Sequence, residues 1–230
     1  MPDYIAQSAY FGAALTLAVY LFSHWLSARL HTPLANPMLI CLGLVILLLL
    51  VLDIDYDAYN QSAHYITYLL TPATACLALP LYRQIQKLRQ HPLAIAAGIL
   101  TGVAVNALTV LAVALAFRLS HADFVTLLPK SVTGAVGMPL AEELGGAGGI
   151  TMAVISVTGI FGNIAAPRIL RLFGVTDRVA QGLAMGCGSH AFGTVRALEV
   201  GEVEGAMSSL SLVITALLTV AAAPLLSRLI

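Results

Sequence analysis

Uncharged stretches long enough to cross a membrane alternate with short polar connections along the chain. Six runs without Asp, Glu, Lys or Arg have this length: residues 4–28, 30–52, 58–82, 90–117, 144–167 and 205–227. A helix needs about 20 such residues to cross roughly 30 Å of hydrocarbon. Two further runs, 131–141 and 179–195, are too short to cross alone as unbroken apolar helices. The pattern predicts about six full transmembrane helices and two broken or re-entrant segments.

The composition places all of these runs in one membrane domain. Of the 230 residues, 59% are hydrophobic and only 10% are charged, whereas soluble domains carry roughly 25% charged residues. Too few charges remain to cover a surface in water, and the connections are too short to hold a soluble domain. We therefore expect an all-α integral membrane protein whose single domain spans residues 1–230.

The basic residues constrain how the short runs cross. They form three clusters, at residues 29–31, 83–89 and 168–178, and such clusters favour the cytoplasmic side. The second and third clusters are separated by two long runs and by the short run 131–141. They share one side only if the short run dips into the membrane and returns. By the same reasoning, residues 179–195 form a half-membrane element that enters from the opposite face.

Weak internal similarity suggests a duplicated unit. The segment TPATACLALPL (71–81) resembles KSVTGAVGMPL (130–140), and LTGVAV (100–105) resembles VTGIFG (157–162). Inverted repeats are typical of secondary transporters. A strict repeat would give the segment 71–81 the broken geometry of the segment 130–140, although the former lies in a full-length run. The sequence leaves this conflict open.

Residues 129–139 combine a helix break with polar side chains. Two prolines and two glycines leave backbone groups unpaired there, and in a membrane such groups are tolerated only inside protein or beside a water-filled cavity. A helix beginning near Lys130 would direct free N–H groups into that cavity, beside the hydroxyls of Ser131 and Thr133 and close to Gly134. This arrangement suits a small carboxylate. Alternatively, the two hydroxyls are ordinary helix caps and Lys130 extends to the interface.

A second polar group follows the glycine-rich start of residues 186–196. It comprises Ser189, His190 and Thr194, with Arg196 beyond them. His190 can titrate near neutral pH and is the candidate for carrying a coupled proton, and Arg196 could bind a carboxylate in bidentate fashion. The alternatives are a neutral, hydrogen-bonded histidine that packs in the core, and an ion pair between Arg196 and Glu199.

Two further features complete the polar inventory. Asn163, an amide in an apolar run, could face the same cavity, although a hydrogen bond between helices explains it equally well. The acidic residues Glu199, Glu202 and Glu204 are expected to form a solvated turn before the last helix.

Catalytic and cofactor sites are not indicated. Ser189 and His190 are adjacent, so their side chains would not face one another on a helix, and no GxSxG or HExxH motif occurs. The three cysteines have no metal-ligand spacing, and a net charge of zero gives no sign of nucleic-acid binding. We expect no enzyme, cofactor or metal site.

Three motifs resemble the LrgB/CidB family of bacterial membrane proteins, which includes the second half of the plant plastid glycolate/glycerate translocator. They are PATACLALPLYRQ (72–84), PKSVT (129–133) and GSHAFGTVRALEVGEVEGAMSSL (188–210). The family usually has Thr-Pro directly after KSVT, whereas here Gly134 and Ala135 follow, which shifts the helix break. It commonly has alanines at positions 188 and 189, which weakens the case for a substrate contact by Ser189.

The resemblance implies two kinds of function. Plant relatives exchange glycolate and glycerate, and some bacterial relatives are associated with pyruvate uptake. The older family description is holin/antiholin-like, modulating murein hydrolase activity and autolysis. The resemblance also implies a multi-pass protein of the bacterial inner membrane, a homo-oligomer, and a small LrgA/CidA-type membrane partner.

Our leading hypothesis is a secondary transporter of small monocarboxylates, with proton coupling through His190; the alternative is the holin-like function. The predicted substrate-binding residues lie in the two broken segments and the helix between them: Lys130, Ser131, Thr133, Gly134, Asn163, Ser189, His190, Thr194 and Arg196.

Overall fold

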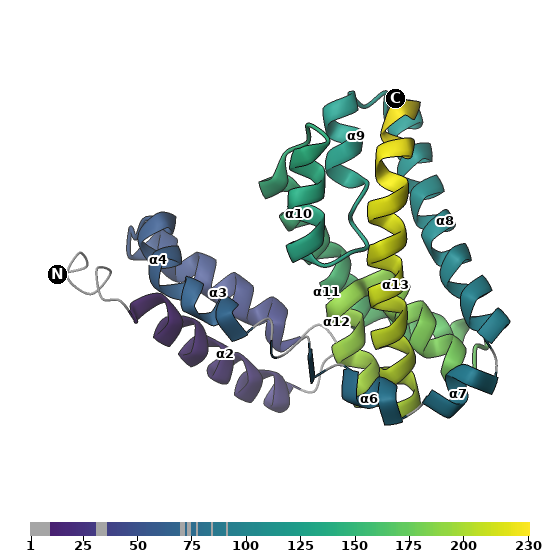
Figure 1. The fold of residues 1–230 in the computed structure, drawn as a ribbon. Coiled ribbons are helices and arrows are strands. Elements are labelled where there is room, and N and C mark those ends of the chain that lie inside the picture. The colour runs from purple at the N-terminus through teal and green to yellow at the C-terminus, as the bar shows by residue number, and fades with distance from the viewer. Residues whose placement is uncertain are drawn as a thin grey trace. The chain divides into compact units, whose positions relative to one another are not determined.

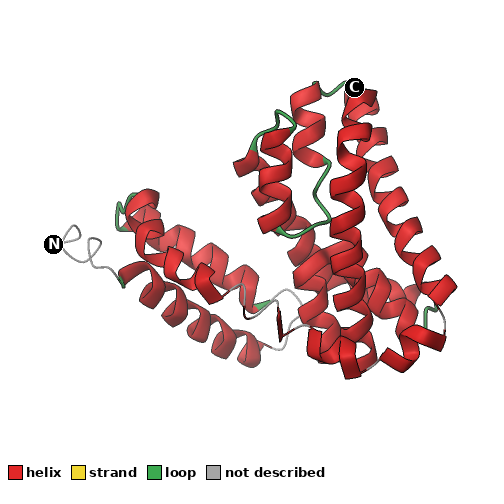
Figure 2. Cartoon of the chain, in the orientation of Figure 1, coloured by secondary structure: helices red, strands yellow, loops and turns green. Residues whose placement is uncertain are grey.

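The described part of the chain consists of helices joined by turns. The computed structural model describes residues 10–30, 36–69, 72, 75, 76, 78–83, 85–90 and 92–230. No strand occurs within these residues (Figure 2), which confirms the predicted all-α fold class. The chain divides into two compact units, Met1–Cys76 and Leu77–Ile230.

The first unit is a group of helices around α2. Its described elements are α2 (Phe11–Leu30), α3 (Pro37–Val51), α4 (Tyr56–Ala63) and the 3-10 helix η1 (His64–Leu69). Asn36 caps α3 by accepting a hydrogen bond from the N–H of Met38 at 2.9 Å, and proline suits the first helical position that follows. α2 joins α4 through a hydrogen bond from the N–H of Gly12 to Ser62 Oγ at 2.6 Å.

Four described helices are long and apolar enough to cross a membrane. They are α2, α8 (Pro92–Phe117), α11 (Gly148–Leu172) and the span Glu202–Leu229, which contains α13 (Glu202–Leu226). The predicted run 30–52 forms the shorter α3. The run 58–82 is not one helix, because α4 ends at Ala63 and a 3-10 helix follows. Some residues of both runs lie outside the described residues.

The second unit surrounds its three long helices with shorter ones. These are α6 (Ala78–Arg83), α7 (Ile85–Gln90), α9 (His121–Leu127), α10 (Gly134–Glu143) and the interrupted α12 (Arg178–Val200). In Figure 1, α8 and α13 run side by side from the end that holds α6 and α7 to the end that holds the C-terminus. We call these the α6–α7 end and the C-terminal end of the unit.

α9 and α10 form a re-entrant hairpin that enters from the C-terminal end. α9 starts beside that end, where Ser120 caps it in a capping box with Asp123. After a turn at residues 128–132, α10 runs back toward the same end. An apolar cluster holds the hairpin against the ends of α8 and α13: Val110, Ala114, Phe124, Val125, Leu128, Leu140 and Ala223.

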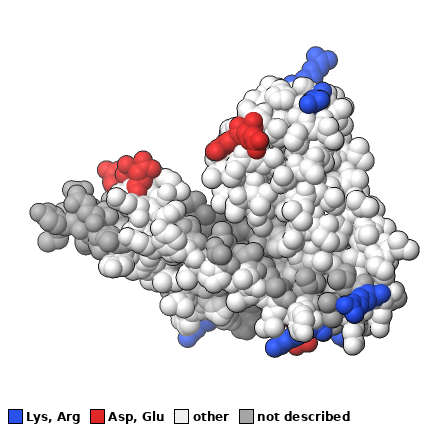
Figure 3. All heavy atoms as spheres, viewed as in Figure 1, with Lys and Arg blue, Asp and Glu red and all other residues white. Residues whose placement is uncertain are grey.

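The charge distribution agrees with this path. On the face drawn in Figure 3, the charged side chains of the second unit gather toward its two ends. α8 begins, and α11 ends, at the α6–α7 end (Figure 1). The basic clusters at residues 83–89 and 168–178 therefore share one side, and the prediction that the short run dips in and returns is confirmed.

Of the two predicted repeat pairs, one can be followed in the structure. Residues 100–105 lie on α8 and residues 157–162 lie on α11, and these helices run in opposite directions (Figure 1). The other pair involves residues 71–81, of which residues 71, 73, 74 and 77 lie outside the described residues.

Candidate functional site

The second broken segment folds back on itself within α12. Two residues leave helical geometry, Ser189 (φ −136°, ψ 16°) and His190 (φ 41°, ψ −130°). Gly193 consequently lies so close to Met185, eight residues earlier, that a Cβ on Gly193 would collide with the Met185 carbonyl. A positive φ at a residue other than glycine costs about 1–3 kcal/mol, so the surrounding structure must hold this turn.

Contacts with α13 show the direction of the two arms of α12. In the first arm, Gly182 lies against Glu204, and Gly186 lies farther along against Ser208 and Ser211. The second arm returns: Thr194 Oγ1 lies 2.9 Å from Ser208 Oγ, and Leu198 packs against Gly205. Both ends of α12 therefore lie near the start of α13. The segment is a re-entrant hairpin that enters from the α6–α7 end, as its short length predicted.

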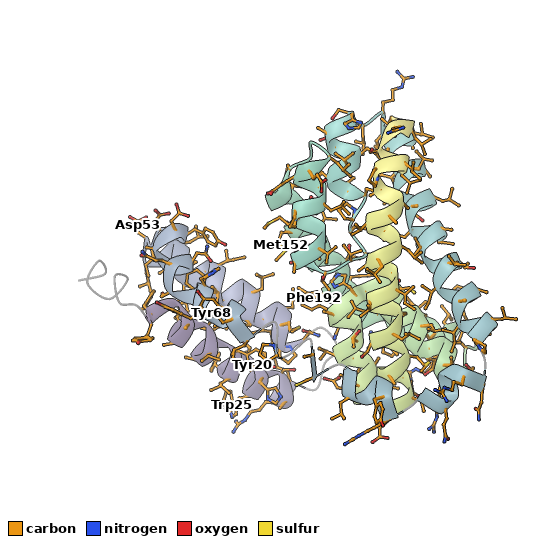
Figure 4. The ribbon with its side chains drawn as sticks, in the orientation of Figure 1. Tyr20, Trp25, Asp53, Tyr68, Met152 and Phe192 are labelled. Carbon is orange, nitrogen blue, oxygen red and sulfur yellow. The ribbon has the colours of Figure 1, made fainter. Side chains whose placement is uncertain are left out.

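Polar bonds from α11 and within α12 hold the fold-back. Asn163 Nδ2 donates to the Phe192 carbonyl at 2.8 Å. Phe192 is labelled in Figure 4. His190 Nε2 lies 3.1 Å from the Ile155 carbonyl; because a carbonyl only accepts, this nitrogen carries the hydrogen. Thr194 Oγ1 donates to the His190 carbonyl at 3.0 Å. These polar atoms position the tip of the hairpin.

Two glycines of α11 make room for that tip. A Cβ on Gly159 would meet the rings of His190 and Phe192, and a Cβ on Gly162 would meet the side chain of Ser189. The segment TGIFGN (158–163) thus supplies the space and, through its asparagine, the hydrogen bond that the fold-back requires.

The first broken segment is fixed by α8. Ser131 is buried in the turn between α9 and α10, and its Oγ donates to Asn106 Oδ1 on α8 at 2.8 Å. Lys130 Nζ lies 3.4 Å from Ser131 Oγ. Thr133 occupies the N-cap position of α10, but its side chain makes no cap hydrogen bond. Gly134 packs against the thioether of Met152, a residue labelled in Figure 4.

The two broken segments meet at a cavity of about 570 Å³. Its walls are α8, the α9–α10 turn and the first arm of α12 as far as Gly188, directly before the fold-back. Most of the lining is apolar. The polar lining residues are Thr101, Asn106, Thr109, Lys130, Ser131 and Asp177. Among the described lining residues, Lys130 is the one basic group and Asp177 the one acidic group; Asp177 caps α12 by accepting from the N–H of Ala180 at 2.8 Å.

The predicted site residues divide between this cavity and the framework around it. Lys130 and Ser131 line the cavity. Ser189 lines a smaller cavity of about 250 Å³ between α11 and α12. The remaining predicted residues are absent from the described lining of both cavities: Thr133, Gly134, Asn163, His190, Thr194 and Arg196.

Two expectations about charged residues can be compared with the structure. Arg196 Nη1 lies 2.6 Å from Glu199 Oε2 on the exposed side of α12, which is the ion pair considered as the alternative to substrate binding. The expected solvated turn is wrong for Glu204, which is 4% exposed. Its carboxylate lies against Gly201; Oε2 has no hydrogen-bond partner among the described residues, and Oε1 lies 3.8 Å from Nε of Arg178.

Sequence reasoning missed Asn106. The available signal was an amide in an apolar run, at the same place after Thr-Gly as Asn163: TGVAVN (101–106) and TGIFGN (158–163).

The fold and site define a multi-pass membrane protein in which two re-entrant hairpins enter from opposite ends and meet at one cavity. The chain belongs to the LrgB-like family, whose model matches residues 16–229. This confirms the resemblance found in the three motifs.

Named relatives cover nearly the whole chain. The holin-like protein CidB of Staphylococcus epidermidis is 37% identical over 212 residues, 92% of this chain and 93% of its own length. CidB of Staphylococcus aureus is 37% identical over 226 residues, 98% of each chain. YxaC of Bacillus subtilis is 35% identical over 204 residues, 89% of each chain. No solved structure matches the chain.

Proposed function

We propose that this protein is a secondary transporter of small monocarboxylates of the glycolate, glycerate and pyruvate kind. The observation that carries the proposal is the cavity of about 570 Å³ at the meeting point of two opposed re-entrant hairpins. Such broken elements are the usual construction of substrate sites in transporters, and the volume lies in the ordinary range of small-molecule pockets, about 300–1,000 Å³.

The polar groups of the cavity suit a carboxylate with a hydroxyl or keto group. Lys130 supplies the positive charge, and the amide of Asn106 retains its Nδ2 donors because Ser131 occupies its oxygen. Thr101, which precedes Asn106 on α8, adds a hydroxyl. The carboxylate would bind near Lys130, and the hydroxyl or keto oxygen would face α8. A charge-assisted hydrogen bond in such surroundings is worth about 1.5–3 kcal/mol.

His190 is the proposed proton-coupling residue. Its Nε2 donates to the Ile155 carbonyl, so an added proton would bind at Nδ1. The resulting charge would lie at the tip of the α12 hairpin, two residues after Gly188, which lines the cavity. Protonation at this point would favour a bound anion. His190→Gln, which keeps a donor of similar reach, is expected to retain exchange of two acids across the membrane and to lose uptake driven by a proton gradient.

The second candidate is a holin-like function, acting on murein hydrolase activity and autolysis. Two relatives that match nearly the whole chain carry the name holin-like protein, and these names favour this candidate over transport. Neither the family description nor these names denotes an enzyme. In both cases we propose a homo-oligomer that acts with a small LrgA/CidA-type membrane protein.

Reconstitution separates the two candidates. The protein, alone and with its small partner, is placed in liposomes that contain both labelled glycolate, glycerate or pyruvate and a large trapped dye. Saturable exchange of acid with the dye retained supports transport. Release of the dye together with the acid supports the holin-like function.

A charge-matched pair of variants tests the site. Lys130→Gln is expected to reduce exchange at least about ten-fold, the loss that removal of one charge-assisted hydrogen bond produces. Arg228→Gln, which removes the same charge from the 3-10 helix η2 outside the cavity, should leave exchange unchanged. Equal effects of the two substitutions would refute the assignment of the cavity.

A further inference from the structure

The second unit carries a repeat with a constant spacing of 57 residues. TGVAVN (101–106) on α8 corresponds to TGIFGN (158–163) on α11. Each motif is followed by a capped helix start: Ser120 accepts a hydrogen bond from the N–H of Asp123, and Asp177 accepts one from the N–H of Ala180. Positions 120 and 177 are separated by the same 57 residues as the two motifs.

The repeated elements have opposite directions. α8 runs toward the C-terminal end and is followed by a hairpin that enters from that end (Figure 1). α11 runs toward the α6–α7 end and is followed by the α12 hairpin, which enters there. The asparagine of each motif bonds the hairpin that follows it, Asn106 at Ser131 and Asn163 at the Phe192 carbonyl. The two halves are therefore related by inversion.

This relation predicts where a second entrance must lie. The first arm of α12 lines the large cavity with residues 179, 180, 183 and 184. Their counterparts 57 residues earlier are 122, 123, 126 and 127, on α9. All four counterparts line a separate cavity of about 380 Å³, together with Gly145, Gly146 and Ala147. A cavity thus exists at the place that the inverted repeat requires, near the C-terminal end.

Three contacts join α9 to the start of α11 beside this second cavity. Thr126 Oγ1 accepts from the N–H of Ala147 at 2.8 Å, and Thr151 Oγ1 donates to the Thr126 carbonyl at 2.9 Å. The backbone at Gly146 approaches so closely that a Cβ there would lie 2.8 Å from Thr126 Oγ1. Both threonines are buried, Thr126 at 4% and Thr151 at 0% exposure. These contacts lock α9 to the start of α11.

The other half of the repeat lacks this lock. The counterpart of Thr126 is Leu183, and the counterpart of Thr151 is Ala94. Both line the large cavity, and neither has a hydroxyl that could bond across it. The two halves therefore differ: α9 is hydrogen-bonded to the start of α11, whereas apolar side chains line the large cavity at the corresponding positions.

We propose that the cavity between α9 and the start of α11 is the opposite entrance of the carboxylate path, and that the contact of Thr126 with Ala147 and Thr151 is its gate. Opening this gate closes the large cavity, because the two inverted halves exchange conformations. The identity of the cargo rests on the proposed function, whereas the gate is defined by the repeat and the contacts alone.

Thiol labelling tests the gate without any cargo. Cys41, Cys76 and Cys187 are first replaced by alanine. Thr101→Cys then reports on the large cavity, and Ile155→Cys reports on the closed side, because Ile155 is buried behind the gate and is the counterpart of Gly98 in the large cavity. A charged, impermeant thiol reagent is applied to membrane vesicles of both orientations.

Removing one gate bond should shift labelling in opposite directions at the two positions. Thr151→Val is expected to raise the labelling rate of Ile155→Cys from one side of the membrane about five-fold, the change in population that loss of one hydrogen bond gives. Labelling of Thr101→Cys from the other side should fall in the same membranes. Ser156→Ala, which removes only a hydroxyl bonded within α11, should change neither rate.

A disulfide lock supplies an independent measurement. In the double variant Thr126→Cys/Gly146→Cys, oxidation should form a disulfide that joins the two sides of the gate. The disulfide should stop exchange of acid and leave Thr101→Cys reactive to the thiol reagent. A reductant should restore exchange. The proposed gate would be refuted if Thr151→Val raised the labelling rate at both positions together. It would also be refuted if the oxidised protein still exchanged acid. If reciprocal labelling is seen but no monocarboxylate is carried, the gate stands and the proposed cargo is wrong.

Discussion

A methyl group added at Gly162 should destabilise the protein in a way that one compensating substitution reverses. In Gly162→Ala, the new Cβ would occupy the position of the Ser189 side chain at the fold-back of α12. Rotation of the Ser189 hydroxyl does not relieve this contact, since the Ser189 Cβ itself would lie 2.5 Å from the new Cβ. The following residue, His190, is held by its bond to the Ile155 carbonyl.

The magnitude follows from the packing. An extra methyl group in a filled site costs about 1–3 kcal/mol. For a chain of this size, about 2 kcal/mol lowers the Tm by about 4–8 °C. Ser189→Gly removes the side chain that the new methyl group would meet, so the double variant Gly162→Ala/Ser189→Gly should recover most of the lost stability.

The assay is the midpoint of thermal unfolding of purified protein in detergent. Gly149→Ala is the matched control on α11, because a Cβ there meets nothing within 4 Å and its Tm should not fall. A Gly162→Ala protein as stable as the parent, or a double variant no better than the single one, would show that α12 does not fold back against α11 as described.

Three further substitutions test the framework. Thr194→Val removes bonds to the His190 carbonyl and to Ser208 and should cost about 1–3 kcal/mol in the free energy of unfolding, whereas Thr194→Ser should restore it; equal Tm values for the two variants would contradict this. Asn163→Leu removes the hydrogen bond to the Phe192 carbonyl and should lower the Tm by a similar amount, measured by the same thermal assay. Glu204→Gln removes the charge from a buried carboxylate whose Oε2 lacks a partner in the described residues and whose Oε1 lies 3.8 Å from Nε of the exposed Arg178. Because the cost of burying the charge outweighs so long an ion pair, the Tm should rise, and a lower Tm would contradict this reasoning.

Much of the site could be located from local signals. The prolines and glycines of residues 129–139 and the glycines of residues 186–193 marked both interruptions, because these residues disfavour continuous helix. The lengths of the two short runs then indicated hairpins rather than crossings. The partner of each interruption could not be found in this way, since Asn106 bonds a residue 25 positions away in the chain.

Other local signals were insufficient because helix length and burial depend on neighbours. An uncharged run sets only an upper limit on a helix, so the run 58–82 was compatible both with one crossing and with the short helices α4, η1 and α6. Glu204 belongs to an acidic stretch that is typical of an exposed turn, yet packing against the first arm of α12 buries it.

The sequence by itself determined the membrane location, the all-α class and the two breaks, since these follow from composition, run length and residues that disrupt helices. Only the tertiary structure decided which polar atoms line the cavity and which ones hold the chain in place. His190, Thr194 and Asn163 have the composition of a binding site, but their side chains are already hydrogen-bonded to the backbone carbonyls of Ile155, His190 and Phe192. Whether a polar group can bind a ligand depends on whether the fold has already used its hydrogen bonds, and that depends on neighbours distant in the chain.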